Sequence, residues 1–271
     1  MNCDIPKFKT QKELFQFLKE NQEDLIYQKK SAVKREDCGI AVHSIEEPKP
    51  QIQNKGSVVD KVDNTDVKVR AIINTTNWMD SHKDVHIKGL WNRSIKNNGH
   101  QIKMLQEHTM KFDHIIADKN DLEVYTKDYT WKELGYDIPG ETEALVFDAN
   151  VKEDRNSFMY KQYKNGNVDN HSVGMQYVKI KMAINDDDDD FKQEKANWDE
   201  YYPMIANKAE ADKHGYFFAV LEAKAIEGSA VPVGSNIMTP TIPRKAHVEE
   251  EQLQPDSRSL EEKEILKFLK S

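Results

Sequence analysis

Two side chains of this sequence could together carry out nucleophilic chemistry. Ser172 lies in the segment HSVGM, and His108 ends the apolar segment MLQEH. A serine hydroxyl attacks a substrate when a base removes its proton, and a histidine held by a third group commonly acts as that base. Such partners meet in space rather than along the chain. Taken alone, a strand serine or a lone histidine is more often a structural residue than a catalytic one.

The segment that contains Ser172 is predicted to be a strand because its residues alternate over 171–184. This alternation places Ser172, Gly174, Gln176, Val178, Ile180 and Met182 on one face. Gly174 has no side chain, which we interpret as room for a substrate backbone. His171 falls on the opposite face from Ser172, so we expect it to be structural.

The remaining pattern predicts many short strands with a few helices between them. A helix in residues 1–40 begins with a capping box made by Thr10 and Glu13. Strands are expected from Val67, up to His108, over 143–151 and over 215–233, and helices over 90–97, 155–165 and 196–213. No regular alternation of strands and helices and no glycine-rich phosphate loop is present. The pattern therefore favours a mainly antiparallel sheet or barrel decorated by helices.

Composition divides the chain into four parts. We expect an N-terminal helical segment (1–40), a polar linker (41–66), a compact domain (67–237) and a polar tail with a short C-terminal helix (238–271). The formal net charge of -8 gives no reason to expect direct nucleic-acid binding. No apolar run approaches the roughly 20 residues of a membrane span, so no membrane contact is expected. Two cysteines, Cys3 and Cys38, favour a reducing compartment.

Four stretches of the compact domain resemble, in order, the prohead proteases of tailed phages, a family similar to the herpesvirus assembly proteases. They are TTNWMDSHKDVHIKGLW, IKMLQEH, HSVGMQY and VLEAKAIEGSAVPVGSN. The resemblance covers about 67–237. It implies that His108 is the base and Ser172 the nucleophile. The acid of the closing segment implies Glu227 as the third member, with Glu222 as runner-up. His171 is a further alternative, because the herpesvirus proteases use a second histidine. Two long insertions depart from the family, one before and one after the Ser172 strand.

The same resemblance implies a fold, a reaction and partners. The fold would be of the α+β, mainly β class: a small, mostly antiparallel β-barrel with peripheral helices, as in the herpesvirus assembly proteases. The reaction would be peptide-bond hydrolysis through an acyl-enzyme, with no cofactor and no metal. The substrates would be the scaffold protein and the major capsid protein, cut inside the assembling procapsid in the host cytoplasm. Self-cleavage in the polar segments and a homodimer or assembly-dependent oligomer are also expected.

Two other interpretations remain open at this point. The chain could be a non-enzymatic scaffold or capsid-assembly protein with the same fold. It could also be a metal-dependent hydrolase that uses Asp80, His82, Asp84 and His86, although ordinary loop polarity explains these residues adequately.

Overall fold

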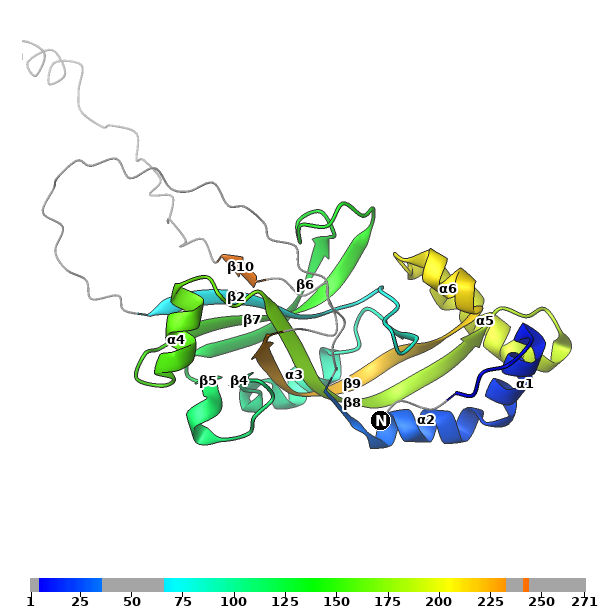
Figure 1. The fold of residues 1–271 in the computed structure, drawn as a ribbon, viewed down its shortest axis with the longest axis horizontal. Helices are drawn as coiled ribbons and strands as arrows, with labels where there is room; N and C mark the ends of the chain where they lie inside the picture. Colours follow the sequence, from blue (N-terminus) through cyan, green and yellow to red (C-terminus); the bar gives the residue numbers. More distant parts are fainter. Residues whose placement is uncertain (1–4, 36–65, 233–240, 244–271) are drawn as a thin grey trace, which may run out of the picture.

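The computed structural model describes residues 5–35, 66–232 and 241–243, which form two β-sheets with helices around them (Figure 1). The larger sheet has the order β1-β8-β9-β4-β5, and β3 also pairs with β9. Its strands are β1 (Val33–Arg35), β3 (Asp84–His86), β4 (Met104–Gln106), β5 (Ile115–Ala117), β8 (Asn170–Ile184) and β9 (Tyr216–Val231). The smaller sheet has the order β10-β2-β7-β6, from β2 (Val67–Thr75), β6 (Leu122–Thr130), β7 (Glu141–Val151) and β10 (Thr241–Pro243).

The pairing is mostly antiparallel, with two exceptions at β9. Both β3 and β4 run parallel to β9, while every other pair in the described sheets is antiparallel. The larger sheet curls into half a barrel (Figure 1). The chain therefore has a mixed fold of the predicted α+β class, with a curled half-barrel sheet.

The main core lies between the two sheets. Side chains of β2 and β7 pack against side chains of β8 and β9, and all are withdrawn from solvent. This packing places β8 and β9 in the core that stabilises the fold, because burying such apolar surface is the main favourable term in folding. The apolar residues that form this contact include Val69, Ala71, Ile73, Leu145, Phe147, Val173, Met175, Tyr177, Phe218 and Val220.

Six α-helices surround the sheets in the described residues. They are α1 (Gln11–Glu20), α2 (Gln22–Ser31), α3 (Asn92–Asn98), α4 (Ser157–Lys164), α5 (Lys192–Tyr201) and α6 (Lys208–His214). The capping box predicted for the first helix is confirmed, since Thr10 and Glu13 cap each other's backbone. The single helix predicted over 196–213 is wrong. It is two helices, α5 and α6, and Pro203 lies between them in a 3-10 turn, where it cannot donate a backbone hydrogen bond.

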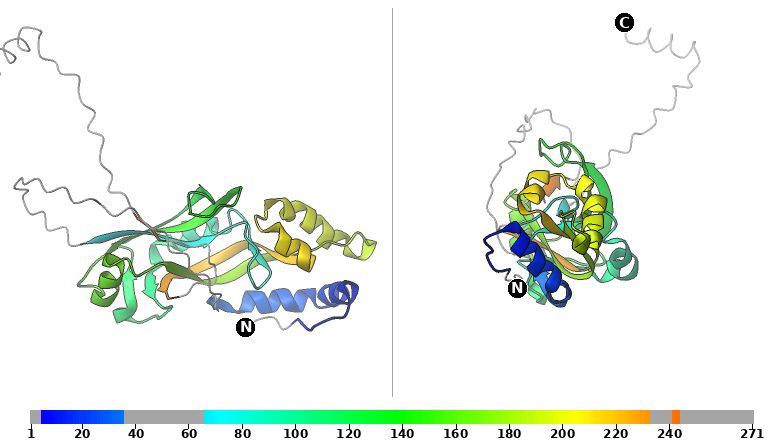
Figure 2. Two further views of the ribbon diagram at one scale, coloured as in Figure 1. Left: turned by 45° about the horizontal axis from the view of Figure 1, so that its top comes forward. Right: turned by 90° about the vertical axis from the view of Figure 1, so that its right-hand side faces the viewer.

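Helix α2 lies along β8, and α1 lies near α5, as Figure 1 and the left view of Figure 2 show. Phe15, Leu18 and Leu25 are buried in the main core, and Lys19 pairs with Glu194 of α5 at 2.7 Å. The N-terminal segment is thus packed onto the sheet. The linker predicted at 41–66 and the predicted C-terminal helix lie almost entirely outside the described residues. No helix in the described parts of the chain is long and apolar enough to cross a membrane.

The alternation predicted for β8 is correct at its start and wrong further on. The register between β8 and β9 shifts between Gly174 and Met175 and again on either side of Lys179. These irregularities reverse the faces, so Ile180 and Met182 join the core together with Val173. Ser172 and Gly174 lie before the shifts and keep the face that the sequence predicts.

Candidate active site

His108 is carried by a tight turn that leaves the end of β4. Glu107 and His108 both have left-handed backbones, with φ of 50° and 55°. Non-glycine residues rarely adopt this conformation, and when they do the surrounding structure must hold them. Here β9 holds the turn: the Glu107 amide donates to the Ala230 carbonyl at 2.9 Å, and the His108 amide donates to the Ser229 hydroxyl at 3.1 Å.

The ring of His108 is held by a carboxylate. Its Nδ1 lies 2.6 Å from Oε1 of Glu227, and the two side chains are only 12% and 4% exposed. An ionised carboxylate only accepts hydrogen bonds, so Nδ1 carries the proton and Nε2 bears the free lone pair. The second oxygen of Glu227 accepts a hydrogen bond from Ser229 at 2.6 Å. Glu227, one of the alternatives for the third member, is therefore the acid that the structure brings to His108.

The space above Gly174 belongs to Glu227 rather than to a substrate. Gly174 and Glu227 are directly opposite in the β8–β9 register. A Cβ on residue 174 would overlap with Oε1 of Glu227 and lie 2.8 Å from its Cδ. The interpretation that this glycine leaves room for a substrate backbone is therefore wrong: its missing side chain lets Oε1 of Glu227 lie over Gly174, where that oxygen contacts His108.

Ser172 lies on the same face of the sheet as this cluster. It is the direct register partner of Ser229, which contacts both the backbone of His108 and the carboxylate of Glu227. Residues directly opposite on neighbouring strands share a face, with Cβ atoms about 4.5–5.5 Å apart. The arrangement thus gathers a hydroxyl, an imidazole and a carboxylate at the β8–β9 junction.

Two polar atoms of this cluster remain without a hydrogen-bond partner among the described residues. They are Oγ of Ser172 and Nε2 of His108, and both are buried. No hydrogen bond joins them to each other. A nucleophile and its base are often farther apart in an unliganded enzyme than in the reacting complex. These atoms are the pair that proton transfer from Ser172 to His108 would require.

The alternatives to Glu227 are placed elsewhere. Glu222 lies opposite Lys179, between two of the β8 irregularities, and pairs with Arg93 at 3.0 Å near the surface. His171 is fully buried on the core face, where its Nε2 lies 2.9 Å from the hydroxyl of Tyr163. Burial lowers the pKa of His171 to about 3. The structure keeps both residues apart from His108, as was expected for His171.

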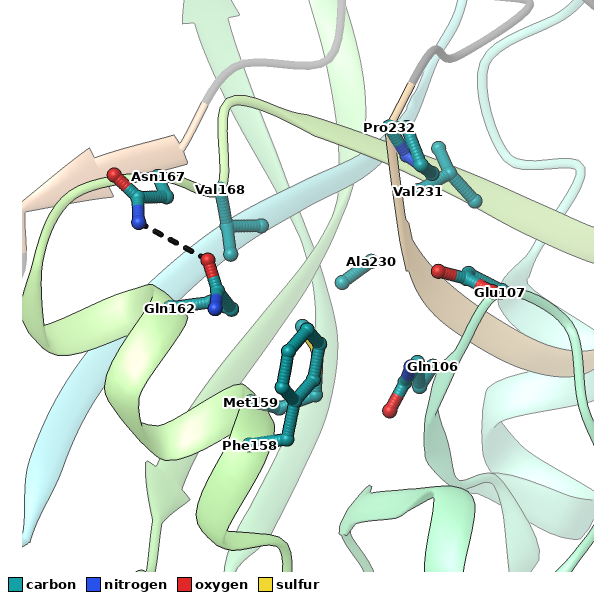
Figure 3. A pocket seen from close by; sticks show the side chains of 10 residues that line it. All are labelled: Gln106, Glu107, Phe158, Met159, Gln162, Asn167, Val168, Ala230, Val231 and Pro232. Carbon is teal, nitrogen blue, oxygen red and sulfur yellow. Dashed lines mark hydrogen bonds between the residues drawn. The ribbon is translucent and has the colours of Figure 1, made fainter.

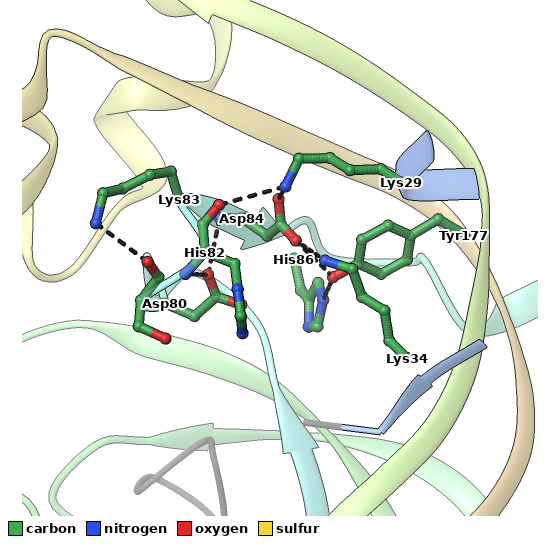
Figure 4. A network of polar contacts seen from close by, with 9 residues as sticks. Lys29, Lys34, Asp80, His82, Lys83, Asp84, His86 and Tyr177 are labelled. Carbon is green, nitrogen blue, oxygen red and sulfur yellow. Dashed lines mark hydrogen bonds and ion pairs between the residues drawn. The ribbon is translucent and has the colours of Figure 1, made fainter. Parts of the chain in front are cut away.

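Asp84 and His86 lie in a buried polar network, and the partly buried Asp80 and His82 are joined to it by hydrogen bonds that involve backbone groups (Figure 4). Asp84 pairs with Lys29 at 2.5 Å and with Lys34, and it accepts a hydrogen bond from Tyr177 at 3.0 Å. Burial pushes the pKa of Asp84 upward, but the two lysines outweigh it and hold that pKa well below its usual value.

The next member of this network, His86, lies within hydrogen-bond distance of Tyr177 and Asn74. Burial lowers the pKa of His86 to about 4. Within the described ranges no three histidine, cysteine, aspartate or glutamate side chains gather as a metal site. The role of the two lysines was not predicted. The available signal was the position of Lys29, which follows Leu25 by one helical turn on the buried face of α2.

A pocket of about 180 Å³ opens beside the turn that carries His108 (Figure 3). Gln106 and Glu107 lie on one side of it, and Phe158 and Met159 of α4 lie on the other. The last residues of β9 and the loop after α4 complete the lining, with Gln162, Asn167, Val168, Ala230, Val231 and Pro232. The pocket therefore adjoins both chain segments that hold the imidazole.

Sequence reasoning assigned no role to Ser229, which bonds to two members of the cluster. The available signal was its spacing, since residues two apart on a strand share a face and Ser229 follows Glu227 by two. Comparison with known proteins adds nothing to this geometry, because no family model, curated protein or solved structure matches the chain.

Proposed function

We propose that this chain is a serine endopeptidase of the prohead protease type, with Ser172 as nucleophile and His108 as base. The observation that carries the proposal is the 2.6 Å contact between Nδ1 of His108 and Glu227, which leaves Nε2 free on the face that holds Ser172. A carboxylate in this position fixes the tautomer of the imidazole and stabilises the imidazolium that forms. His108, Ser172 and Glu227 come, in this order along the chain, from three of the four stretches that resemble the family.

The proposed reaction is a two-step acyl transfer. The Ser172 hydroxyl oxygen attacks the peptide carbonyl carbon while His108 Nε2 takes the hydroxyl proton. The carbon–nitrogen bond then breaks, and the same proton passes from Nε2 to the leaving amine. Water attacks the resulting ester, gives a proton to His108, and the carboxylic acid product leaves as the Ser172 oxygen regains that proton.

The biological setting follows from the family resemblance. The substrates would be the scaffold and major capsid proteins inside the assembling procapsid, in the host cytoplasm, and the barrel fold would be that of the herpesvirus assembly proteases. The chain would also cut its own polar segments, and a homodimer or assembly-dependent oligomer would be the active form. An assembly requirement accords with the burial of Ser172, which is only 3% exposed.

A non-enzymatic scaffold or capsid-assembly protein is the second candidate. The observation that favours it is the same burial of Ser172, because a substrate carbonyl must reach that hydroxyl. The two candidates differ in chemistry: an enzyme reacts with a serine-directed probe at Ser172, and a scaffold does not.

The test is covalent labelling with a fluorophosphonate probe, followed by peptide mapping. We expect one modified residue, Ser172, no label on Ser172→Ala, and a loss of peptidase activity of at least about 10⁴-fold in that variant. Incubation of the full chain should also shorten it, and the Ser172→Ala chain should stay intact. A properly folded wild-type chain that takes no label, alone or in its assembled form, would overturn the proposal.

A further inference from the structure

Ser229 is a fully buried serine beside the proposed triad. Its hydroxyl donates to Oε2 of Glu227 at 2.6 Å and accepts from the backbone amide of His108 at 3.1 Å. A serine hydroxyl has one proton to donate, and here that proton is committed to the carboxylate. Ser229 is therefore arranged to hold two other residues rather than to attack a substrate.

We infer that Ser229 is a positioning residue that sets the orientation of both Glu227 and His108. This inference rests on the proposed function, since it assigns Ser229 a part in preparing His108 as a base. The Ser229 hydroxyl donates a hydrogen bond to the Glu227 carboxylate, and its oxygen accepts one from the His108 amide. One hydroxyl thus couples the side chain of the acid to the backbone of the base.

The backbone of His108 is the first reason that this coupling matters. Its left-handed conformation, with φ of 55°, follows a left-handed Glu107, and such residues persist only where neighbouring groups hold them. Ser229 is the group that holds the His108 amide, through the hydrogen bond to its hydroxyl oxygen. Without the hydroxyl, a buried N–H would lose its acceptor and the turn would lose one of its two anchors on β9.

The second reason is the carboxylate of Glu227, whose Oε1 lies over Gly174 where it contacts the imidazole. One oxygen contacts His108 and the other contacts Ser229, so the carboxylate is held at both ends. A carboxylate held by two hydrogen bonds loses rotational freedom, and it therefore presents one oxygen to Nδ1 in a fixed direction.

The test compares Ser229→Ala with Ser229→Thr, which retains the hydroxyl, in the full-length chain. We expect the second-order rate of Ser172 labelling by a fluorophosphonate probe to fall about 10- to 100-fold in Ser229→Ala, the range typical of groups that orient functional histidines in metal sites. Ser229→Thr should restore most of that rate. With a peptide substrate the loss should appear in kcat, with KM nearly unchanged, because Ser229 makes no substrate contact.

Proton NMR of the imidazole supplies a readout that a merely structural role would not change. The Nδ1 proton between His108 and Glu227 should give a low-field resonance in the wild type, and Glu227→Gln should abolish it. Ser229→Ala should shift or broaden this resonance, and Ser229→Thr should retain it. Ser229→Cys keeps the volume with a weaker donor and replaces Ser229→Ala if the alanine variant does not fold.

The outcomes separate the two proposals. A wild-type labelling rate and an unchanged resonance in Ser229→Ala would overturn the role of Ser229 and leave the peptidase proposal standing. An unlabelled wild type would overturn the peptidase proposal, while a resonance that depends on Ser229 would still support the positioning role. Label found on Ser229 instead of Ser172 would overturn both.

Discussion

Two buried polar clusters lie on the larger sheet, and they differ in how completely their atoms are bonded. In the cluster around Asp84, the carboxylate pairs with Lys29 and Lys34 and also accepts from Tyr177. In the cluster around Glu227, the carboxylate is equally well bonded, but Nε2 of His108 and Oγ of Ser172 lack partners among the described residues.

The difference indicates that the Asp84 cluster stabilises the fold, whereas the Glu227 cluster retains polar atoms that are available to react. Leaving a buried polar atom unbonded costs free energy, so such atoms call for an explanation. Buried indole nitrogens of Trp91 and Trp131 also lack partners, but an indole N–H cannot act as nucleophile or base. Among the described residues, Ser172 and His108 bring an unbonded hydroxyl and an unbonded imidazole nitrogen to the same cluster, and these two atoms have complementary reactivity.

The largest expected effect is the loss of charge balance in the Asp84 cluster. Asp84→Asn leaves Lys29, which is 5% exposed, and Lys34 without their counter-charge. Breaking a buried pair in this way typically costs about 3–5 kcal/mol of unfolding free energy. Urea denaturation at pH 7 measures it, with Lys34→Met as the milder control. An unchanged midpoint would show that the cluster contributes no cohesion.

A smaller effect, on activity instead of stability, is expected at Gly174. Gly174→Ala places a methyl group where Glu227 Oε1 lies, and the flexible end of that side chain can move aside. The chain should still fold, but the carboxylate would leave the imidazole. We expect probe labelling of Ser172 to slow about 100-fold, or about 2.7 kcal/mol in the activation barrier.

The matched control for this variant is Gly99→Ala, where the added Cβ would make only an ordinary contact, 3.6 Å from Cγ2 of Ile95. Like Gly174, Gly99 has no positive φ, so its alanine variant adds the same methyl group without backbone strain and without touching Glu227. Comparable labelling rates in both variants would refute the steric role that we assign to Gly174.

The smallest effect is a pH dependence of the unfolding free energy that comes from His86 in the Asp84 cluster. Burial lowers the pKa of His86 in the folded chain to about 4 from an ordinary value of 6.5. The unfolded chain therefore binds a proton first as pH falls. The stability contribution of neutral His86 is fully present above about pH 6.5 and is lost progressively as pH falls toward 4. The expected slope is about 1.4 kcal/mol per pH unit for one histidine.

Urea denaturation between pH 7 and pH 5 measures this slope. His171 should contribute in the same direction, because burial lowers its pKa to about 3. His86→Gln cannot titrate, so it should remove about half of the combined slope. A slope unaltered by His86→Gln would exclude His86 as the source.

Much of the fold was predictable from the sequence, because the signals for those elements are local. The capping box at Thr10, the strand from Val67 and the first residues of β8 follow from patterns within a few residues. The later part of β8 was not predictable, because bulges depend on pairing with β9, which is remote in sequence. The division between α5 and α6 did carry a local sign, Pro203, and was missed nonetheless.

For the candidate site, the sequence identified residues but not their contacts. His108, Ser172 and Glu227 were named from motifs, and the structure brings Glu227 to His108. The role of Gly174 was misinterpreted, since its opposite partner comes from a register that no single strand reveals. The anchoring by Ser229 and the burial of Lys29 could not be predicted either, because each depends on a contact between residues more than 50 positions apart in the sequence.

The short strand β1 determines how the protein would behave after its backbone is cleaved on the C-terminal side of that strand. Val33–Arg35 add to the edge of β8 opposite Gly174, Met175 and Gln176, and two lysines, Lys29 of α2 and Lys34 of β1, bind Asp84. These attachments all precede residue 36. A backbone cut anywhere between residues 36 and 65 would therefore yield two polypeptides that remain together as one particle, with the smaller piece released only when the protein is denatured.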